Sequence, residues 1–330
     1  MSEREITVQE AVREALDEEL ARDPDMLLMG QDLGIYGGAF GVTAGLLDKY
    51  GVGRVRETPI SEASTMGLAV GAALMGLRPV VEFMFMDFIT LAMDQLANHA
   101  AKISFMYGGQ CGVPLVVRAP FGAGRGYGVS HSQSLEAWLV HVPGLKVVIP
   151  SNPADAKGLL KSAIRDDNPV VFLEHKLVYP VKGLVDDAAA VPPLRGARVV
   201  RAGSDVTLVG YGHQLVMISK VADELAARGV SAEVVDVRVL KPLDIETIVA
   251  SVRRTRRAVI VEEGTELCSV GSEIAHQIST HCFGDLAGPV VKLSGRDTPV
   301  PAAMNLERGY LPQPADVVAC VDKMLAAVRA

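Results

Sequence analysis

The chain has 330 residues, of which 49% are hydrophobic and 22% are charged, and this composition is typical of a folded globular protein. The length exceeds that of a typical single domain, so we expect two compact units, each with its own hydrophobic core. There are 32 Lys and Arg residues against 39 Asp and Glu residues, a net charge of −7, and the basic residues are scattered apart from the run at 253–257. Nucleic acid is therefore not an expected partner.

Neither the cysteines nor the N-terminus suggests export or a membrane. The four cysteines are far apart and form no CxxC pair, which argues against a zinc ribbon or a disulfide framework: Cys111, Cys268, Cys282 and Cys320. We expect four buried thiols in a reducing compartment. The first 20 residues are acidic, unlike targeting peptides, so we expect a cytoplasmic protein. The longest apolar stretch, 63–77, is shorter than the roughly 20 residues that cross a bilayer, and we predict a buried helix.

The first half of the chain alternates segments of helical period with short, β-rich segments. We expect helices near 7–22, at 63–76, near 88–106 and at 155–167, and strands at 26–30, 79–84, 114–120, 145–150 and 169–175. This alternation predicts α/β layers over a mostly parallel sheet.

The periodicity fades at 182–197, where proline and glycine collect, so we place one domain at 1–185, a linker at 186–198 and a second domain at 199–330. Alternation then resumes, which predicts a second α/β domain. We expect its strands at 204–212, 231–240 and 258–263, and its helices at 213–229, 244–254 and 272–280.

A glycine pair at Gly210 and Gly212 invites a nicotinamide-cofactor interpretation, because it follows a strand and opens a helix. The third glycine of that fingerprint is replaced by Leu215, and the acid about 20 residues on would have to be Glu233 or Asp236, at strand positions. We favour a tight strand-to-helix turn.

Glu62 stands between a proline turn and an apolar run rich in glycine and alanine. An acid in the first turn of a helix is stabilised by the helix dipole by about 0.3–1 kcal/mol, with Ser61 or Thr58 as a possible cap. However, Ile60 and Met66 surround it with apolar groups, and glycines four residues apart allow a second helix to approach. A carboxyl desolvated in this way is suited to sharing a proton with a weakly basic ring nitrogen.

Seven segments in fixed order carry a family resemblance: GQDLG (30–34), GGAFGVTAGL (37–46), TPISE (58–62), GLRPVVEFMFMDF (76–88), HSQS (131–134), the run 143–174 and SGRDTPVP (294–301). Together they resemble the beta subunit of the thiamine-diphosphate-dependent first component of 2-oxo acid dehydrogenase complexes, over nearly the whole chain. The resemblance implies an N-terminal pyrimidine-binding domain of the transketolase type, with a parallel sheet layered by helices, and a C-terminal α/β domain like that of transketolase.

The resemblance also implies partners and a cofactor. We expect an α2β2 heterotetramer with thiamine diphosphate bound between an alpha and a beta subunit, docked on the lipoyl acyltransferase core of the complex. Family alpha subunits hold Mg²⁺ through a GDG motif and a later Asn, whereas the only Gly-Asp here is Gly284-Asp285. The chain alone is therefore expected to bind the cofactor poorly, and buried faces that lack a partner favour a homo-oligomer when it is isolated.

The family motifs assign roles to individual residues. Glu62 matches the acid that hydrogen-bonds the aminopyrimidine ring and promotes formation of the carbon nucleophile, and Ile60 matches an apolar contact to the cofactor. Phe88 matches an aromatic of the same pocket, although a role in the core is at least as well supported. His131 follows a glycine-rich loop and matches a histidine that acts near the substrate during decarboxylation and acyl transfer.

Two further sites come from the resemblance alone. The segment 163–168 resembles one that encloses a structural potassium ion, with five expected ligands: Leu115, Ala163, Ile164, Asp166 and Asn168. A helix end followed by a turn before Pro169 explains that segment equally well. Asp297 is the expected contact for the small subunit-binding domain of the acyltransferase. One departure is Gln31, a neutral amide where the family usually has an acid near the cofactor.

Pyruvate is the expected substrate, with acetoin and branched-chain 2-oxo acids as alternatives that this chain alone does not separate. Two other classes are a silent scaffold that only anchors the complex, disfavoured because Glu62 and His131 are both present, and a nicotinamide oxidoreductase, disfavoured by the incomplete glycine fingerprint.

Overall fold

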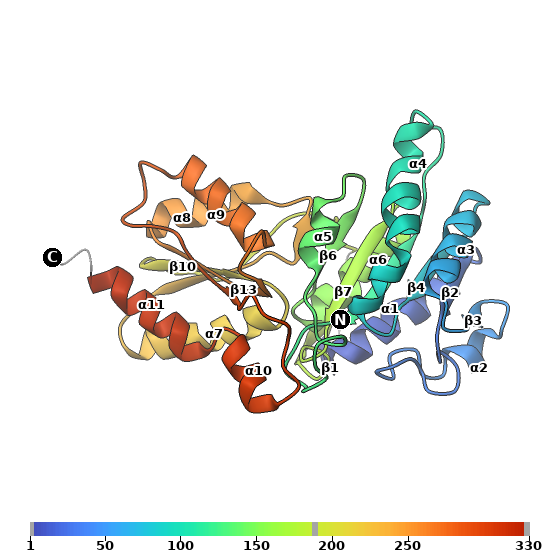
Figure 1. The fold of residues 1–330 in the computed structure, drawn as a ribbon, viewed down its shortest axis with the longest axis horizontal. Coiled ribbons are helices and arrows are strands. Elements are labelled where there is room, and N and C mark those ends of the chain that lie inside the picture. The colour runs from blue at the N-terminus through green and yellow to red at the C-terminus, as the bar shows by residue number, and fades with distance from the viewer. Residues whose placement is uncertain (1–2, 187–190, 327–330) are drawn as a thin grey trace. The chain divides into compact units, whose positions relative to one another are not determined.

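The computed structural model describes residues 3–186 and 191–326. They form two compact units, which Figure 1 shows as ribbons: the first comprises 1–121 and 138–194, and the second comprises 122–137 and 195–330. A division by chain position alone would leave 122–137 in the first unit, but its contacts place it in the second. Of the expected linker at 186–198, residues 187–190 lie outside the described part, and 198 already belongs to a strand of the second unit.

The first unit is built on parallel strands in the spatial order β6-β7-β5-β4-β2-β3. The strand sequences are nearly continuous apolar runs because helices and loops cover both faces of such a sheet. Their bounds are β2 Met26–Gly30, β3 Val55–Glu57, β4 Arg78–Glu82, β5 Val116–Phe121, β6 Lys146–Val148 and β7 Val170–His175. A separate antiparallel ribbon pairs β1 (Glu3–Thr7) with β8 (Lys182–Asp186).

Helices of the first unit begin at recognisable signals. Thr7 caps α1 (Val8–Arg22) in a reciprocal capping box with Glu10, and Asn152 caps α6 (Pro153–Arg165), which has proline at its first position. These two helices pack on each other, and α3 (Glu62–Leu74) packs on β4. The short helices are α2 (Leu46–Tyr50) and α5 (Glu136–His141).

The helix expected near 88–106 is not one regular helix. It consists of a 3₁₀ segment η1 (Met86–Ala92), a π-helical segment η2 (Asp94–Ala100) and a short α-helix α4 (Ala101–Met106). In η1 the Thr90 hydroxyl donates to the Asp87 carbonyl, which supports the tighter turn. Both η1 and η2 pack against α3, so the irregular segment shapes the surroundings of that helix.

A buried ionic network joins three neighbouring strands of the first unit. Arg118 on β5 is fully buried, and its guanidinium donates to both oxygens of Glu174 on β7 at 2.7 Å and to Glu82 on β4 at 2.5 Å. Tyr179 donates to Glu174 at 2.8 Å. One guanidinium faces two carboxyls, and burial raises the pKa of Glu82 while Arg118 opposes that rise.

The second unit is a five-stranded sheet in the order β14-β13-β10-β11-β9, parallel except for β9. Figure 1 shows α8 and α9 on one face of this sheet and α7 and α11 on the other. The strands of this sheet are β9 Arg198–Arg201, β10 Val206–Gly210, β11 Ala232–Asp236, β13 Ala258–Thr265 and β14 Val291–Gly295, and the short strand β12 Val239–Lys241 is not part of it. The helices are α7 Gly212–Ala227, α8 Ile245–Thr255, α9 Val270–His281, α10 Met304–Tyr310 and α11 Pro314–Ala326.

Two local expectations are wrong. All four cysteines are free, but only Cys282 is buried, and Cys268 is exposed with a positive φ of 53° in the connection between β13 and α9. Neither expected cap closes α3: Ser61 occupies the N-cap position, yet its side chain accepts no hydrogen bond from the helix. The tight turn expected at Gly210 and Gly212 is confirmed, since β10 ends at the first and α7 begins at the second. Across the described ranges, no helix is long and apolar enough to span a bilayer.

Replacing Arg118 with Met is expected to lower the free energy of unfolding by about 3–5 kcal/mol, because two buried carboxyls lose the guanidinium that they share. The matched control is Arg56→Met, which removes an exposed arginine from β3 of the same sheet. Urea unfolding of the isolated chain measures both changes. Equal losses in the two variants would contradict a structural role for the network.

Candidate active site

Glu62 opens α3 and is buried, with 7% of its surface exposed. Its Oε1 accepts a hydrogen bond from the Gln31 side-chain amide at 3.3 Å, and within the described residues no other side chain donates to it. No cation balances the carboxyl there. A buried carboxylate with one long hydrogen bond costs folding free energy, which is typical of a residue kept for function.

The site lies at the carboxyl edge of the parallel sheet, where ligands of open α/β sheets bind. Gln31 directly follows β2, and the TPISE segment directly follows β3, which pairs with β2. The Thr58 amide donates to the Gly30 carbonyl at 2.8 Å, so the two connections run together. A Cβ atom at Gly30 would stand 2.7 Å from the Glu82 carbonyl oxygen, which explains why glycine occupies the end of β2.

The two other cofactor residues expected from the sequence also lie in the first unit. Phe88, on η1, is half-buried and meets Phe85 edge to face with ring centroids 6.2 Å apart. Ile60 is 82% exposed, although it stands two residues before Glu62. The Thr58 hydroxyl oxygen is buried without a hydrogen-bond partner. A buried acid, an unpaired hydroxyl and an exposed apolar side chain therefore occupy one short segment, and they fit a heteroaromatic ligand.

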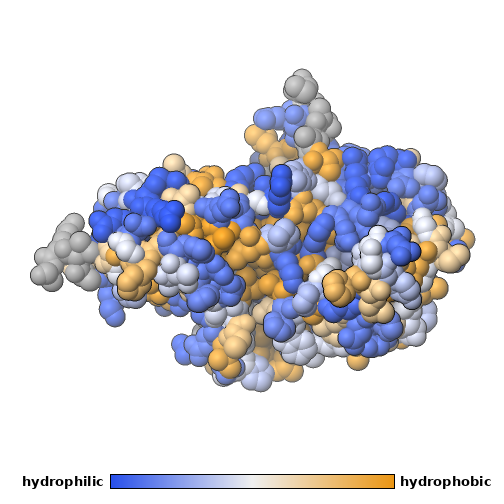
Figure 2. Space-filling model, turned by 90° about the horizontal axis from the view of Figure 1, so that it is seen from above, coloured by the Kyte–Doolittle hydropathy of each residue, from blue (hydrophilic) through white to orange (hydrophobic). Residues whose placement is uncertain are grey.

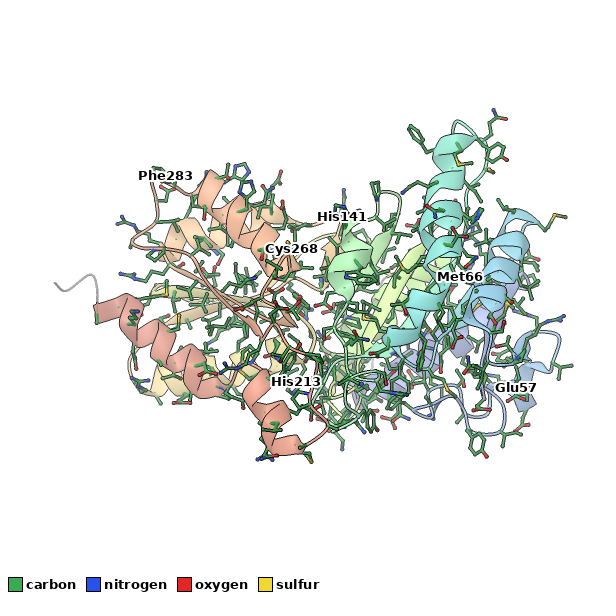
Figure 3. All side chains as sticks on the ribbon, viewed as in Figure 1. Glu57, Met66, His141, His213, Cys268 and Phe283 are labelled. Atoms are coloured by element: carbon green, nitrogen blue, oxygen red, sulfur yellow. The ribbon has the colours of Figure 1, made fainter. Side chains whose placement is uncertain are left out.

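Figure 3 labels two nearby side chains, Glu57 and Met66, on the elements that flank this segment. Glu57 ends β3 and accepts from the Gly34 amide at 2.9 Å, which ties the loop after β2 to the strand beside it. Met66, one turn into α3, is fully buried and anchors that helix in the core. These contacts hold both sides of the Glu62 turn in place.

His131 lies in the second unit. It is half-buried, and its Nδ1 is 3.0 Å from the Ser130 hydroxyl. The adjacent Ser130 hydroxyl is thus placed to orient the imidazole. Ser132 is buried with its hydroxyl unpaired, and Ser134 donates to Glu263.

A cluster of carboxyl groups beside this loop was not expected from the sequence. The Tyr211 hydroxyl lies 2.8 Å from Glu136 Oε1 and 3.0 Å from Glu262 Oε2. One hydroxyl donates one proton, so a carboxyl must itself be protonated for both bonds to form. Glu262 also accepts from Ser269 and from the Gly271 amide. The proton therefore belongs to Glu136, whose pKa is raised to about 7 by burial, with Glu262 and Glu263 adding to that rise.

The five residues expected to bind potassium also lie in the first unit. Arg78 donates to the Ile164 and Asp166 carbonyls at 3.2 Å each, and the Lys146 ammonium pairs with the Asp166 carboxylate. The Asn168 amide donates to Asp166 Oδ1 at 2.9 Å, as expected for the alternative turn. Arg78 and Lys146 therefore already supply positive charge at these oxygens.

Asp297 is exposed in the second unit, two residues after the end of β14. Its neighbour Arg296 lines a cavity of about 890 Å³, together with Tyr310 of α10 and Cys320 of α11. The described residues contain no group of three or more His, Cys, Asp or Glu side chains placed to hold a metal ion.

Comparison with known proteins first defines the class. The chain matches the family "Transketolase, pyrimidine binding domain" at residues 4–182 and "Transketolase, C-terminal domain" at residues 196–317. The solved chain described as "Split gene transketolase, inactive beta4 tetramer" superposes with a TM-score of 0.78 at 26% identity, covering 97% of this chain and 98% of that one. The predicted α/β fold with two transketolase-type domains is confirmed.

Individual relatives then give the family. The chain is 48% identical to "Pyruvate dehydrogenase E1 component subunit beta-2, mitochondrial" of Oryza sativa subsp. japonica, over 96% of this chain and 85% of that protein. It is 46% identical to the corresponding beta subunit of Rhizobium meliloti, over 96% and 69%. It is 41% identical to "Acetoin:2,6-dichlorophenolindophenol oxidoreductase subunit beta" of Cupriavidus necator, over 98% of each. The chain belongs to the family of beta subunits of the first component of 2-oxo acid dehydrogenases, as its motifs predicted.

Replacing Glu136 with Gln is expected to stabilise the chain at pH 8 but not at pH 5. In the folded state this carboxyl keeps its proton up to about pH 7, whereas in the unfolded state it ionises near its ordinary value of 4.5. Wild-type stability therefore falls as pH rises between these values, by on the order of 3 kcal/mol in total, and Gln removes that loss. Urea unfolding at both pH values measures it, with exposed Glu273→Gln as the control. An equal gain at both pH values would contradict the assignment of the proton.

Proposed function

We propose that the chain is the beta subunit of a pyruvate dehydrogenase and that, with an alpha partner, it carries out thiamine-diphosphate-dependent oxidative decarboxylation of pyruvate and reductive acylation of lipoamide. The observation that carries the proposal is the buried Glu62 carboxyl at the carboxyl edge of the sheet, in a domain matched as pyrimidine-binding. The pyruvate dehydrogenase beta subunits among the relatives support this substrate.

Glu62 is the residue we assign to proton handling at the cofactor ring. A carboxyl group removed from water makes a strong, directional hydrogen bond to a ring nitrogen, and it holds or releases a proton at that atom. The Gln31 amide at 3.3 Å orients the carboxyl without adding a second negative charge. Thiamine diphosphate, when bound, supplies a carbon nucleophile and an electron sink. Ile60 and Phe88 would exclude water from the ring.

An alpha partner is supported by apolar surface that the described chain leaves uncovered. Figure 2 shows hydrophobic residues at the surface among hydrophilic ones. In the first unit Met75, at the end of α3, is 84% exposed, and Phe105, near the end of α4, is 89% exposed. Large apolar side chains that stand in solvent in the isolated chain favour burial against a partner. We assign Mg²⁺ and the diphosphate to the partner, and we propose that the heterotetramer is α2β2.

His131 is the residue we assign to substrate handling. Its contact with the Ser130 hydroxyl at 3.0 Å orients the imidazole, and the residue is half-buried. An imidazole is able to donate or accept a proton near neutral pH, which suits decarboxylation followed by acyl transfer.

The finer assignments follow from the same family. Carbonyl oxygens around Ile164 and Asp166 would hold potassium, and exposed Asp297 would contact the acyltransferase core. The domain limits at 185 and 199, and a cytoplasmic location, stay predictions. Acetoin is the second substrate candidate, because the acetoin oxidoreductase beta subunit of Cupriavidus necator matches 98% of this chain. Branched-chain 2-oxo acids stay a third prediction.

The test is Glu62→Gln in the complex with the alpha subunit. Turnover of pyruvate is expected to fall by roughly 10²-fold or more, because the amide cannot exchange a proton with the ring. The thermal unfolding temperature of the isolated variant is expected to match or exceed that of wild type, since a buried carboxyl with one long hydrogen bond is replaced by a neutral amide of the same shape. The control is Glu5→Gln, an exposed glutamate on β1. Turnover that stays at the wild-type level, with or without a loss of thermal stability, would show that Glu62 has a structural role.

A further inference from the structure

The loop that carries His131, residues 122–137 (the His131 loop), is closed at its ends by one buried carboxylate. Glu263, on β13, has 2% of its surface exposed. Its Oε1 accepts from the Ala123 amide at the start of the loop and from the Ser134 hydroxyl near its end, the latter at 3.0 Å. The Gly122 amide donates to the Gln133 carbonyl at 3.4 Å beside it. The ends of the loop are thereby drawn together around one acceptor.

A second buried carboxylate holds the middle of the same loop. Glu307, on α10, is 2% exposed, and its two oxygens accept from the Gly124 amide at 2.8 Å and the Gly126 amide at 2.9 Å. Hydrogen bonds to ionised acceptors are roughly twice as strong as neutral ones. The backbone on either side of Arg125 is therefore fixed to α10. Figure 1 shows this helix in red, near the C-terminal end of the colour scale.

Two positions of the loop have backbone conformations and close neighbours that favour glycine. Gly126 has a φ of 69° and Gly128 a φ of 76°, both in the left-handed region. A Cβ atom at Gly126 would stand 3.1 Å from the Ala302 carbonyl oxygen, and one at Gly128 would stand 3.2 Å from the Ala302 side chain. The glycine-rich sequence thus allows the loop to lie against the segment before α10.

Surface loops are usually the most mobile parts of a protein, and backbone amides in them bind water at little cost. Here two carboxylates are buried instead, although each burial costs folding free energy. Such a folding cost is expected where a side chain on the loop must be held in position to within a fraction of an ångström.

We propose that Glu263 and Glu307 are positioning residues, which hold the His131 loop in the conformation that presents His131 to the substrate. Neither carboxylate touches the substrate in this account, and both act through the loop backbone. This positioning role rests on the function proposed for His131. The hydrogen bonds that anchor the loop do not depend on that function.

The first experiment measures the loop in the isolated chain. Trypsin cleaves after Arg125, so the initial rate of that cleavage, followed by mass spectrometry, reports how often the loop leaves α10. Glu307→Gln and Glu263→Gln are expected to raise this rate on the order of tenfold, because each leaves a backbone amide without its charged acceptor. Ser134→Ala, which removes only one donor to Glu263, is a milder second variant, and its rate is expected to rise less. Exposed Glu273→Gln is the charge-matched control.

The second experiment measures kinetics in the complex with the alpha subunit. The variants are expected to lower kcat on the order of tenfold with the KM for thiamine diphosphate unchanged, since only the geometry of His131 is altered. Unchanged cleavage after Arg125 would overturn the anchoring. Faster cleavage with unchanged kcat would overturn the positioning role. If the wild-type complex does not turn over pyruvate, the proposed function fails, while the cleavage rates still decide the anchoring.

Discussion

The Glu62 carboxyl is removed from water at the first turn of α3, and among the residues that the structure describes its one side-chain donor is the Gln31 amide, 3.3 Å from one of its oxygens. Such an arrangement loses hydration without gaining a counter-ion, so it persists only because the surrounding fold holds it. The strands β2 and β3 end side by side and bring the two residues together, and buried Met66 fixes the helix that follows. The same burial that costs folding free energy leaves the carboxyl available to a ligand.

Buried charge is accommodated differently around Arg118, on β5 of the same sheet. Arg118, Glu82 and Glu174 are buried as a bonded network, in which one guanidinium bonds two carboxyls and joins three strands. In the second unit, the Glu136 and Glu262 carboxyls both bond the Tyr211 hydroxyl, and the raised pKa of Glu136 keeps a proton on that carboxyl. The three sites thus handle buried acids in three ways: with a cation, with a retained proton, and, at Glu62, with a single amide that leaves the carboxyl available to a ligand.

Much of this was predictable from the sequence, and the failures have physical causes. Strands β2 and β7 and helix α6 follow from apolar runs and capping signals within short windows. Glu62 followed from its place in a motif. The Arg118 network was missed because it depends on the pairing of strands 36 and 56 residues apart, although the single charge inside each apolar strand was a visible signal. The place of 122–137 in the second unit was missed because Glu263 and Glu307 lie more than 100 residues further along the chain.

The central claim is that this chain supplies half of a cofactor site, and calorimetry tests it most directly. Thiamine diphosphate with Mg²⁺ is titrated into the isolated chain and then into the chain reconstituted with its alpha partner. The account predicts no measurable binding to the isolated chain and one cofactor bound per alpha–beta pair in the complex. Tight binding to the isolated chain, accompanied by turnover of pyruvate, would contradict it.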